Sequence, residues 1–152
     1  MPSITNELCT TFFDEMLGGT HDLDSSGDTV KIALLKSADS LTGSYGKSTT
    51  NYSEVVANSD EASGTGYTAG GSTLSGQTVA NASGVAYVDF SDISWSISGT
   101  MTAGGALIYN SSQSNKAIAV IDFGGDHVVS SQTITIGFPV ADQNNAIIRL
   151  EN

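Results

Sequence analysis

A glycine-rich segment near the middle of the chain restricts the fold more than any other feature. It runs Gly64-Thr-Gly-Tyr-Thr-Ala-Gly-Gly-Ser-Thr-Leu-Ser-Gly76 and places five glycines in thirteen residues. Glycine costs a helix interior about 1 kcal/mol per position relative to alanine, so this segment does not form a helix. It also lacks the lysine that follows the glycines of a phosphate-binding loop. We therefore expect a shaped loop that leads into β structure, as in a structural protein rather than an enzyme.

The size and charge of the chain limit the number of domains and the kinds of binding partner that can be expected. Its 152 residues are expected to form a single domain, residues 1–152. Five basic residues stand against sixteen acidic ones, a formal net charge of −11. Nucleic-acid binding depends on Lys and Arg side chains that neutralise phosphates, so we expect no nucleic-acid partner. The charge either serves solubility alone or matches a basic partner surface.

Membrane insertion and secretion are not expected from the hydropathy pattern. No apolar run approaches the roughly 18 residues that a spanning helix requires, so we expect no membrane partner. The N-terminus also lacks a basic region followed by a long apolar stretch, and we therefore expect no signal peptide.

The N-terminal residues 1–19 predict one amphipathic helix, with helical turns over residues 3–17. Ser3 can accept a hydrogen bond from a free backbone N–H at the start of the helix, and Gly18-Gly19 can end it. An apolar stripe follows from a spacing of four residues, formed by Ile4, Leu8, Phe12 and Met16. The stripe either covers the β core or docks on a neighbouring subunit. The only cysteine, Cys9, falls in this segment and is expected to be a small buried thiol.

Residues 29–35 predict the first strand, and residues 38–76 a long Gly/Ser/Thr-rich loop. Both faces of residues 29–35 are partly apolar, which is typical of a central strand. Within the loop, residues 51–54 (Asn-Tyr-Ser-Glu) resemble a capping box that opens a short helix. The loop is either a cover over the core or a contact surface between subunits. Its tyrosines can fix it by packing while their hydroxyls stay hydrogen-bonded: Tyr45, Tyr52 and Tyr67.

Residues 77–152 predict a strand-rich core. Short alternating segments recur there, and Trp95 alternates with serines, so its side chain is expected in the core rather than on a sugar-stacking surface. Turns are predicted at residues 104–105, 124–126 and 142–145, which are rich in Gly, Asp and Asn. The fold class is therefore mainly β: an antiparallel β-sandwich or small barrel with an N-terminal amphipathic helix and a long loop.

One acidic turn is a weak candidate for a calcium site. Asp22, Asp24 and Ser26, followed by Gly27, match the first half of an EF-hand loop, in which oxygen ligands alternate along the chain. In a non-EF site, Asp28 would join these three oxygen-bearing side chains. The acid needed at the twelfth position is replaced by Ala33, inside a predicted strand. The pattern favours a tight turn without metal, with a non-EF calcium site as the alternative.

No motif for catalysis accompanies the two histidines. His21 and His127 lie in predicted turns, where a solvated side chain is the usual case. The sequence has neither a G-x-S-x-G nucleophile elbow nor an H-E-x-x-H zinc motif. We expect no enzyme activity and no cofactor, although the spacing of a paired-carboxylate hydrolase cannot be read from sequence.

An ordered series of segments carries a resemblance over nearly the whole chain. In sequence order the series is Lys31-Ile-Ala-Leu-Leu35, Asn51-Tyr-Ser-Glu-Val55, the glycine segment at 64–76, Trp95, Ala106-Leu-Ile-Tyr-Asn110 and Val120-Ile-Asp-Phe-Gly-Gly125. The series resembles small virion structural proteins of tailed bacteriophages. The resemblance implies a non-enzymatic capsid decoration or cement protein, made in the bacterial host cytoplasm and bound to the capsid exterior.

The resemblance also implies partners and a contact surface. The partners would be the major capsid protein and further copies of the chain, as a homotrimer that closes by cyclic symmetry. The expected assembly contacts are Ile4, Leu8, Phe12, Tyr45, Tyr52 and Tyr67. A tail component (tube, baseplate or fibre-tip adhesin) is the first alternative, and a carbohydrate-binding module or small hydrolase is the second.

Overall fold

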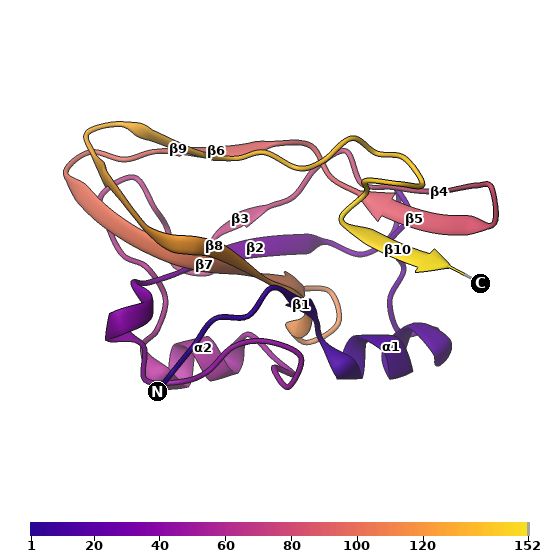
Figure 1. The fold of residues 1–152 in the computed structure, drawn as a ribbon, viewed down its shortest axis with the longest axis horizontal. Helices are drawn as coiled ribbons and strands as arrows, with labels where there is room; N and C mark the ends of the chain where they lie inside the picture. Colours follow the sequence, from indigo (N-terminus) through magenta and orange to yellow (C-terminus); the bar gives the residue numbers. More distant parts are fainter. Residues whose placement is uncertain (152) are drawn as a thin grey trace.

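The computed structural model describes residues 1–151 as three antiparallel sheets with short helices (Figure 1). The prediction of a mainly β, antiparallel, sandwich-like fold is confirmed. The elements in chain order are β1 (Glu7–Leu8), α1 (Thr10–Leu17), β2 (Val30–Leu35), the 3-10 turn η1 (Ala38–Ser40), α2 (Ser53–Asn58), β3 (Ser72–Thr73), β4 (Thr78–Ala82), β5 (Val85–Asp89), β6 (Ile93–Ser96), β7 (Thr100–Asn110), β8 (Lys116–Ser130), β9 (Thr133–Ile136) and β10 (Ile148–Glu151).

The largest sheet holds the core and has the strand order β1-β8-β7-β2-β3. The sequence prediction of a central first strand is confirmed, because β2 lies between β7 and β3. Four consecutive residues of β2, from Ile32 to Leu35, are fully buried on both faces. A strand with two apolar faces needs cover on both sides, and the helices supply it below while β6 and β9 supply it above (Figure 1).

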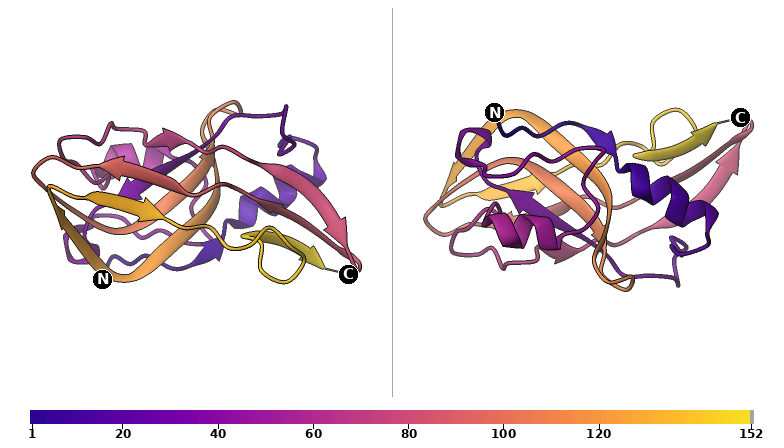
Figure 2. Two further views of the ribbon diagram at one scale, coloured as in Figure 1. Left: turned by 90° about the horizontal axis from the view of Figure 1, so that it is seen from above. Right: turned by 90° about the horizontal axis from the view of Figure 1, so that it is seen from below.

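The three-stranded sheet β10-β5-β4 extends from this body as an arm. It lies at the same end of the molecule as α1 and the C-terminus (Figures 1 and 2). The β4–β5 hairpin turns at Ser83 and Gly84, which both have positive φ (52° and 85°), as a tight two-residue turn requires. The helices of the described chain are all too short and polar to span a membrane.

The N-terminal helix is shorter than predicted. Helix α1 begins at Thr10, and the residues before it are extended, with β1 paired to β8. The backbone of Tyr45 exchanges hydrogen bonds with this segment, accepting from Thr5 N–H (2.9 Å) and donating to Ser3 carbonyl (2.8 Å). The pairing with β8 and these bonds to the loop outweigh the weak helix propensity of the Thr and Asn residues. A spacing of four places Ile4 and Leu8 on one side of an extended chain as well as of a helix.

Two of the predicted glycine turns are wrong, because the strands continue through them. Gly104 and Gly105 lie inside β7, where the pairing with β8 shifts register between Ala103 and Gly105. Gly124 and Gly125 lie inside β8 with φ of 73° and 151°. Glycine here bends a long strand at a bulge instead of ending it. The third prediction is confirmed, because the Asp142 carboxylate accepts N–H bonds in a turn over residues 142–145.

The loop over residues 38–76 is ordered by local hydrogen bonds. The predicted capping box is confirmed: Glu54 Oε1 accepts the N–H of Asn51 (3.2 Å), and Asn51 Oδ1 accepts the N–H of Ser53 (2.9 Å). The glycine segment packs directly on the core sheet, since a Cβ on Gly71 would lie 1.8 Å from the carbonyl oxygen of Ile32. Trp95 is buried as predicted and donates from Nε1 to Ser72 Oγ at 2.8 Å.

Candidate functional site

The acidic turn over residues 22–28 is built from its own carboxylates. Asp22 Oδ1 accepts the N–H of Asp24 (3.2 Å), and Asp24 Oδ1 accepts the N–H of Ser25 (2.7 Å). Both oxygens of Asp28 also accept hydrogen bonds from the protein. Within residues 1–151, no three His, Cys, Asp or Glu side chains are grouped to hold a metal ion. At the site of the predicted calcium ligands, the described chain therefore forms a hydrogen-bonded turn and not an assembled set of ligands.

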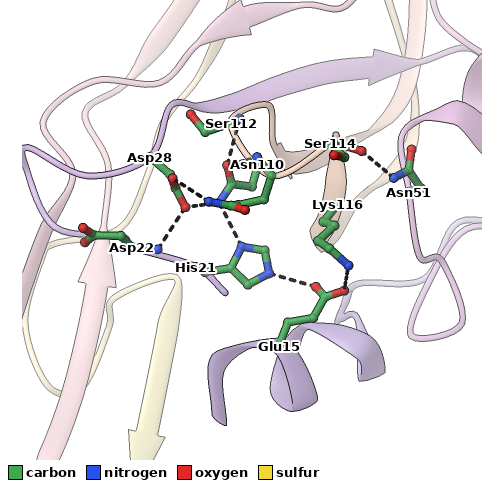
Figure 3. Close-up of polar contacts among 10 residues, drawn as sticks. Glu15, His21, Asp22, Asp28, Asn51, Asn110, Ser112, Ser114 and Lys116 are labelled. Atoms are coloured by element: carbon green, nitrogen blue, oxygen red, sulfur yellow. Dashed lines mark hydrogen bonds and ion pairs between the residues drawn. The ribbon is translucent and has the colours of Figure 1, made fainter. Parts of the chain in front are cut away.

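A buried polar network lies beside this turn and centres on His21 (Figure 3). The His21 side chain is fully buried, contrary to the expectation of a solvated histidine. The amide of Asn110 is oriented by its Oδ1, which accepts the N–H groups of Ser112 (3.1 Å) and Gln113 (3.2 Å). Its Nδ2 therefore donates to Asp28 Oδ2 (2.7 Å) and to His21 Nδ1 (2.9 Å). In this orientation Nδ1 of His21 accepts from Asn110, and Nε2 is left to donate.

Glu15 completes the network from helix α1. Its Oε2 accepts the Nε2–H of His21 (2.8 Å), and its Oε1 pairs with Lys116 Nζ (2.5 Å). Burial raises the pKa of Glu15, but the hydrogen bonds from Lys116 and His21 outweigh burial and leave this pKa below its usual value. The network joins α1, the acidic turn and the β7–β8 turn. Since both ring nitrogens of His21 are occupied, the arrangement fits a structural joint and not proton transfer to a substrate.

A second polar cluster fixes the long loop and centres on Asp60, whose exposed fraction is 0%. Its carboxylate pairs with Lys36 Nζ (2.9 Å) and accepts the Tyr45 hydroxyl (2.8 Å). It also accepts the backbone N–H groups of Thr42 and Gly43 (2.7–3.0 Å). Burial raises the pKa of Asp60, but these bonds, led by the one from Gly43, outweigh burial and lower it.

The neighbouring Glu61 fixes the two remaining tyrosines of the loop. Tyr52 and Tyr67 donate their hydroxyl hydrogens to its carboxylate at 2.6 and 2.7 Å, and Gly70 N–H donates to it at 2.7 Å. The ring of Tyr52 stacks on Tyr109 at 4.6 Å between centroids. The expectation that the loop tyrosines pack with bonded hydroxyls is confirmed. Sequence reasoning missed Asp60 and Glu61, whose only signal is two adjacent acids between tyrosines.

The six residues predicted as assembly contacts lie largely inside the chain's own fold. Ile4, Phe12 and Tyr45 are buried, and Leu8, Tyr52 and Tyr67 are half-buried against the core. Buried side chains offer little surface to another subunit, so their packing is first a matter of the monomer's stability. The exposed large apolar side chains of α1 are instead Phe13 and, at the end of the helix, Leu17.

An apolar groove lies between helix α1 and the arm sheet, with a volume of about 470 Å³. Phe12 and Met16 line it from the helix, and Val79, Val88 and Ile148 line it from the arm. The carboxylate-bearing residues Asp22 and Asp24 also line it, so the acidic turn forms one boundary of the groove. This combination of apolar walls and an acidic boundary is a candidate binding surface.

Comparison with known proteins finds no relative of the chain. The chain matches no protein-family model, no curated protein and no solved structure.

Proposed function

We propose that the protein is a non-enzymatic structural component of a tailed-phage virion, and that it decorates the outside of the capsid. The ordered series of segments that resembles phage virion proteins carries this proposal. On this proposal the protein binds the major capsid protein at capsomer junctions and associates as a homotrimer on local threefold axes.

The charge distribution supports a position outside the DNA-filled interior. Within residues 1–151, only Glu15 and Asp60 have a Lys, Arg or His group within 4.0 Å among the sixteen acidic residues of the sequence. Except for the buried Asp89, the remaining carboxylates are exposed or half-buried and give an acidic surface that repels nucleic acid. The same surface attracts a protein partner that presents lysine or arginine side chains.

The rigid loop also supports a binding role. A decoration subunit folds alone before it meets the capsid, and its contact loops therefore need internal support. The Asp60 and Glu61 clusters give the loop that support through carboxylate–tyrosine and carboxylate–backbone bonds. A preformed loop loses less conformational entropy when it binds.

The test is the copy number of the protein in purified virions, measured by quantitative mass spectrometry against the major capsid protein. A number comparable to that of the capsid protein is expected for a decoration protein. A few copies per particle would replace this proposal with a tail component. Absence from virions would refute any virion role.

A further inference from the structure

The groove between α1 and the arm sheet is an apolar hollow on a highly charged chain, with the buried side chains of Phe12, Val88 and Ile148 in its walls. Two side chains at its margin keep about half of their surface in water: Val79 at 49% and Leu150 at 46%. Leu17, at the end of the same helix, is 91% exposed. Single exposed apolar residues are ordinary, but Val79 and Leu150 border the same apolar hollow. Such a surface is typical of a protein-binding site.

The apolar side chains that the arm contributes to the groove lie on one face of its sheet. Alternation along β4, β5 and β10 places Val79, Val88 and Ile148 on one face, and these three residues are directly paired across the strands. Their side chains face the helix side, where Phe12 and Met16 form the opposite wall. The volume of about 470 Å³ falls in the range of ligand-binding clefts and accommodates a few apolar side chains.

The acidic boundary identifies the chemistry of the occupant. Asp22 and Asp24 are both exposed, and each uses one carboxylate oxygen to accept a backbone N–H within the turn. Within residues 1–151, neither has a Lys, Arg or His group within 4.0 Å. A lysine or arginine placed at this end of the groove would meet two carboxylates at the edge of an apolar site, where an ion pair is less screened than on open surface.

We propose that the groove binds a segment of another protein that carries large apolar side chains followed by lysine or arginine. A second copy of the chain fits poorly, because each copy has a net charge of −11 and only five basic residues. On the proposed function the segment belongs to the major capsid protein, and this assignment, unlike the groove's chemistry, rests on that function.

The first experiment selects binders from a random 12-residue peptide display library with the immobilised full chain. Selected peptides are expected to combine two or more large apolar residues with an adjacent Lys or Arg. Their affinities are then measured by fluorescence anisotropy with groove variants. Leu150→Asp is expected to weaken binding about tenfold, because it places a charge among apolar contacts. The double variant Asp22→Asn/Asp24→Asn keeps the turn-accepting oxygens and is expected to weaken binding about threefold.

Matched controls separate the groove from general charge and folding effects. Val56→Asp introduces the same charge at an exposed valine on α2, 56% exposed and outside the groove, and is expected to leave binding unchanged. Thermal unfolding of each variant shows whether it remains folded. Selection of acidic or purely polar peptides, failure to select any peptide, or equal binding by the Leu150 variant of a folded chain would overturn the proposal.

A second assay separates this inference from the proposed function. Purified capsids that lack the protein are mixed with the wild type and with the Leu150→Asp variant. Binding of both to equal extents supports capsid decoration and overturns the groove assignment. Peptide binding in the groove without capsid binding supports the groove and refutes the decoration function. Loss of capsid binding by the Leu150 variant alone supports both.

Discussion

Substitution of Gly71 by alanine tests how the glycine segment is held against the core. Gly71 has a φ of +66°, which costs an L residue about 1–2 kcal/mol. Its added Cβ would also lie 1.8 Å from the carbonyl oxygen of Ile32 and 2.8 Å from the Cα of Ala33. Both atoms belong to the backbone of the central strand β2, so they cannot rotate away as a side chain can. Separating β3 from β2 adds an overpacking cost of about 1–3 kcal/mol.

The sum predicts a loss of about 3 kcal/mol in the free energy of unfolding for Gly71→Ala. Gly124→Ala is the matched control, because Gly124 has a similar φ of 73° but no atom within 4 Å of its added Cβ. The control is expected to lose only about 1 kcal/mol. Urea unfolding followed by the fluorescence of the single tryptophan, Trp95, measures both variants. Equal losses for the two variants would refute the steric argument and leave backbone strain as the whole effect.

Three further substitutions test the buried carboxylates. Asp60→Asn is expected to lose about 3 kcal/mol at pH 7, because an amide cannot replace the carboxylate toward Lys36 and the surrounding donors. The folded pKa of Asp60 is lowered, so its contribution is complete above the unfolded value of about 3.9 and disappears as pH falls through the folded pKa. Urea unfolding at a series of pH values should therefore show the two proteins converging below about pH 4; a constant difference would contradict the linkage. Asp89→Asn is expected to gain about 1 kcal/mol at pH 7, since burial raises the pKa of Asp89 and the amide removes the buried charge. Unchanged or lower stability in thermal unfolding would count against this reading. Glu61→Gln is expected to lose about 1 kcal/mol, because the Tyr52 hydroxyl can turn to accept from the new amide, and a loss above 3 kcal/mol would show that the charge itself is needed.

The sequence predicted the elements whose signals are local. The alternation around Trp95, the two apolar faces of residues 30–35 and the capping box at Asn51 each depend on a few neighbouring residues, and each is present in the structure. The predicted helix is confirmed over residues 10–17 but is wrong over residues 3–9, because a spacing of four fits both a helix and an extended chain. Only the pairing of β1 with β8, more than 100 residues away, decides between them.

The polar clusters could not be predicted for the same reason. His21 and Asn110 are separated by 89 residues, and Asp28 and Gln113 by 85. No periodicity marks such pairs, because each member looks like an ordinary turn residue in its own segment. The glycine pairs at residues 104–105 and 124–125 misled for a related reason: glycine permits both a turn and a bulge, and the partner strand determines which one forms.

The strand order also has a consequence for how the chain folds. The edge strand β1 pairs with Val120 and Ala119 of β8, and β2 pairs with β7. The strands of the N-terminal third can therefore enter the sheet only when residues far along the chain have folded beside them. Folding rates fall as the mean sequence separation of contacts rises. The chain should therefore fold slowly and expose its apolar strands before the sheet is complete. Its strong negative charge then keeps partly folded molecules apart.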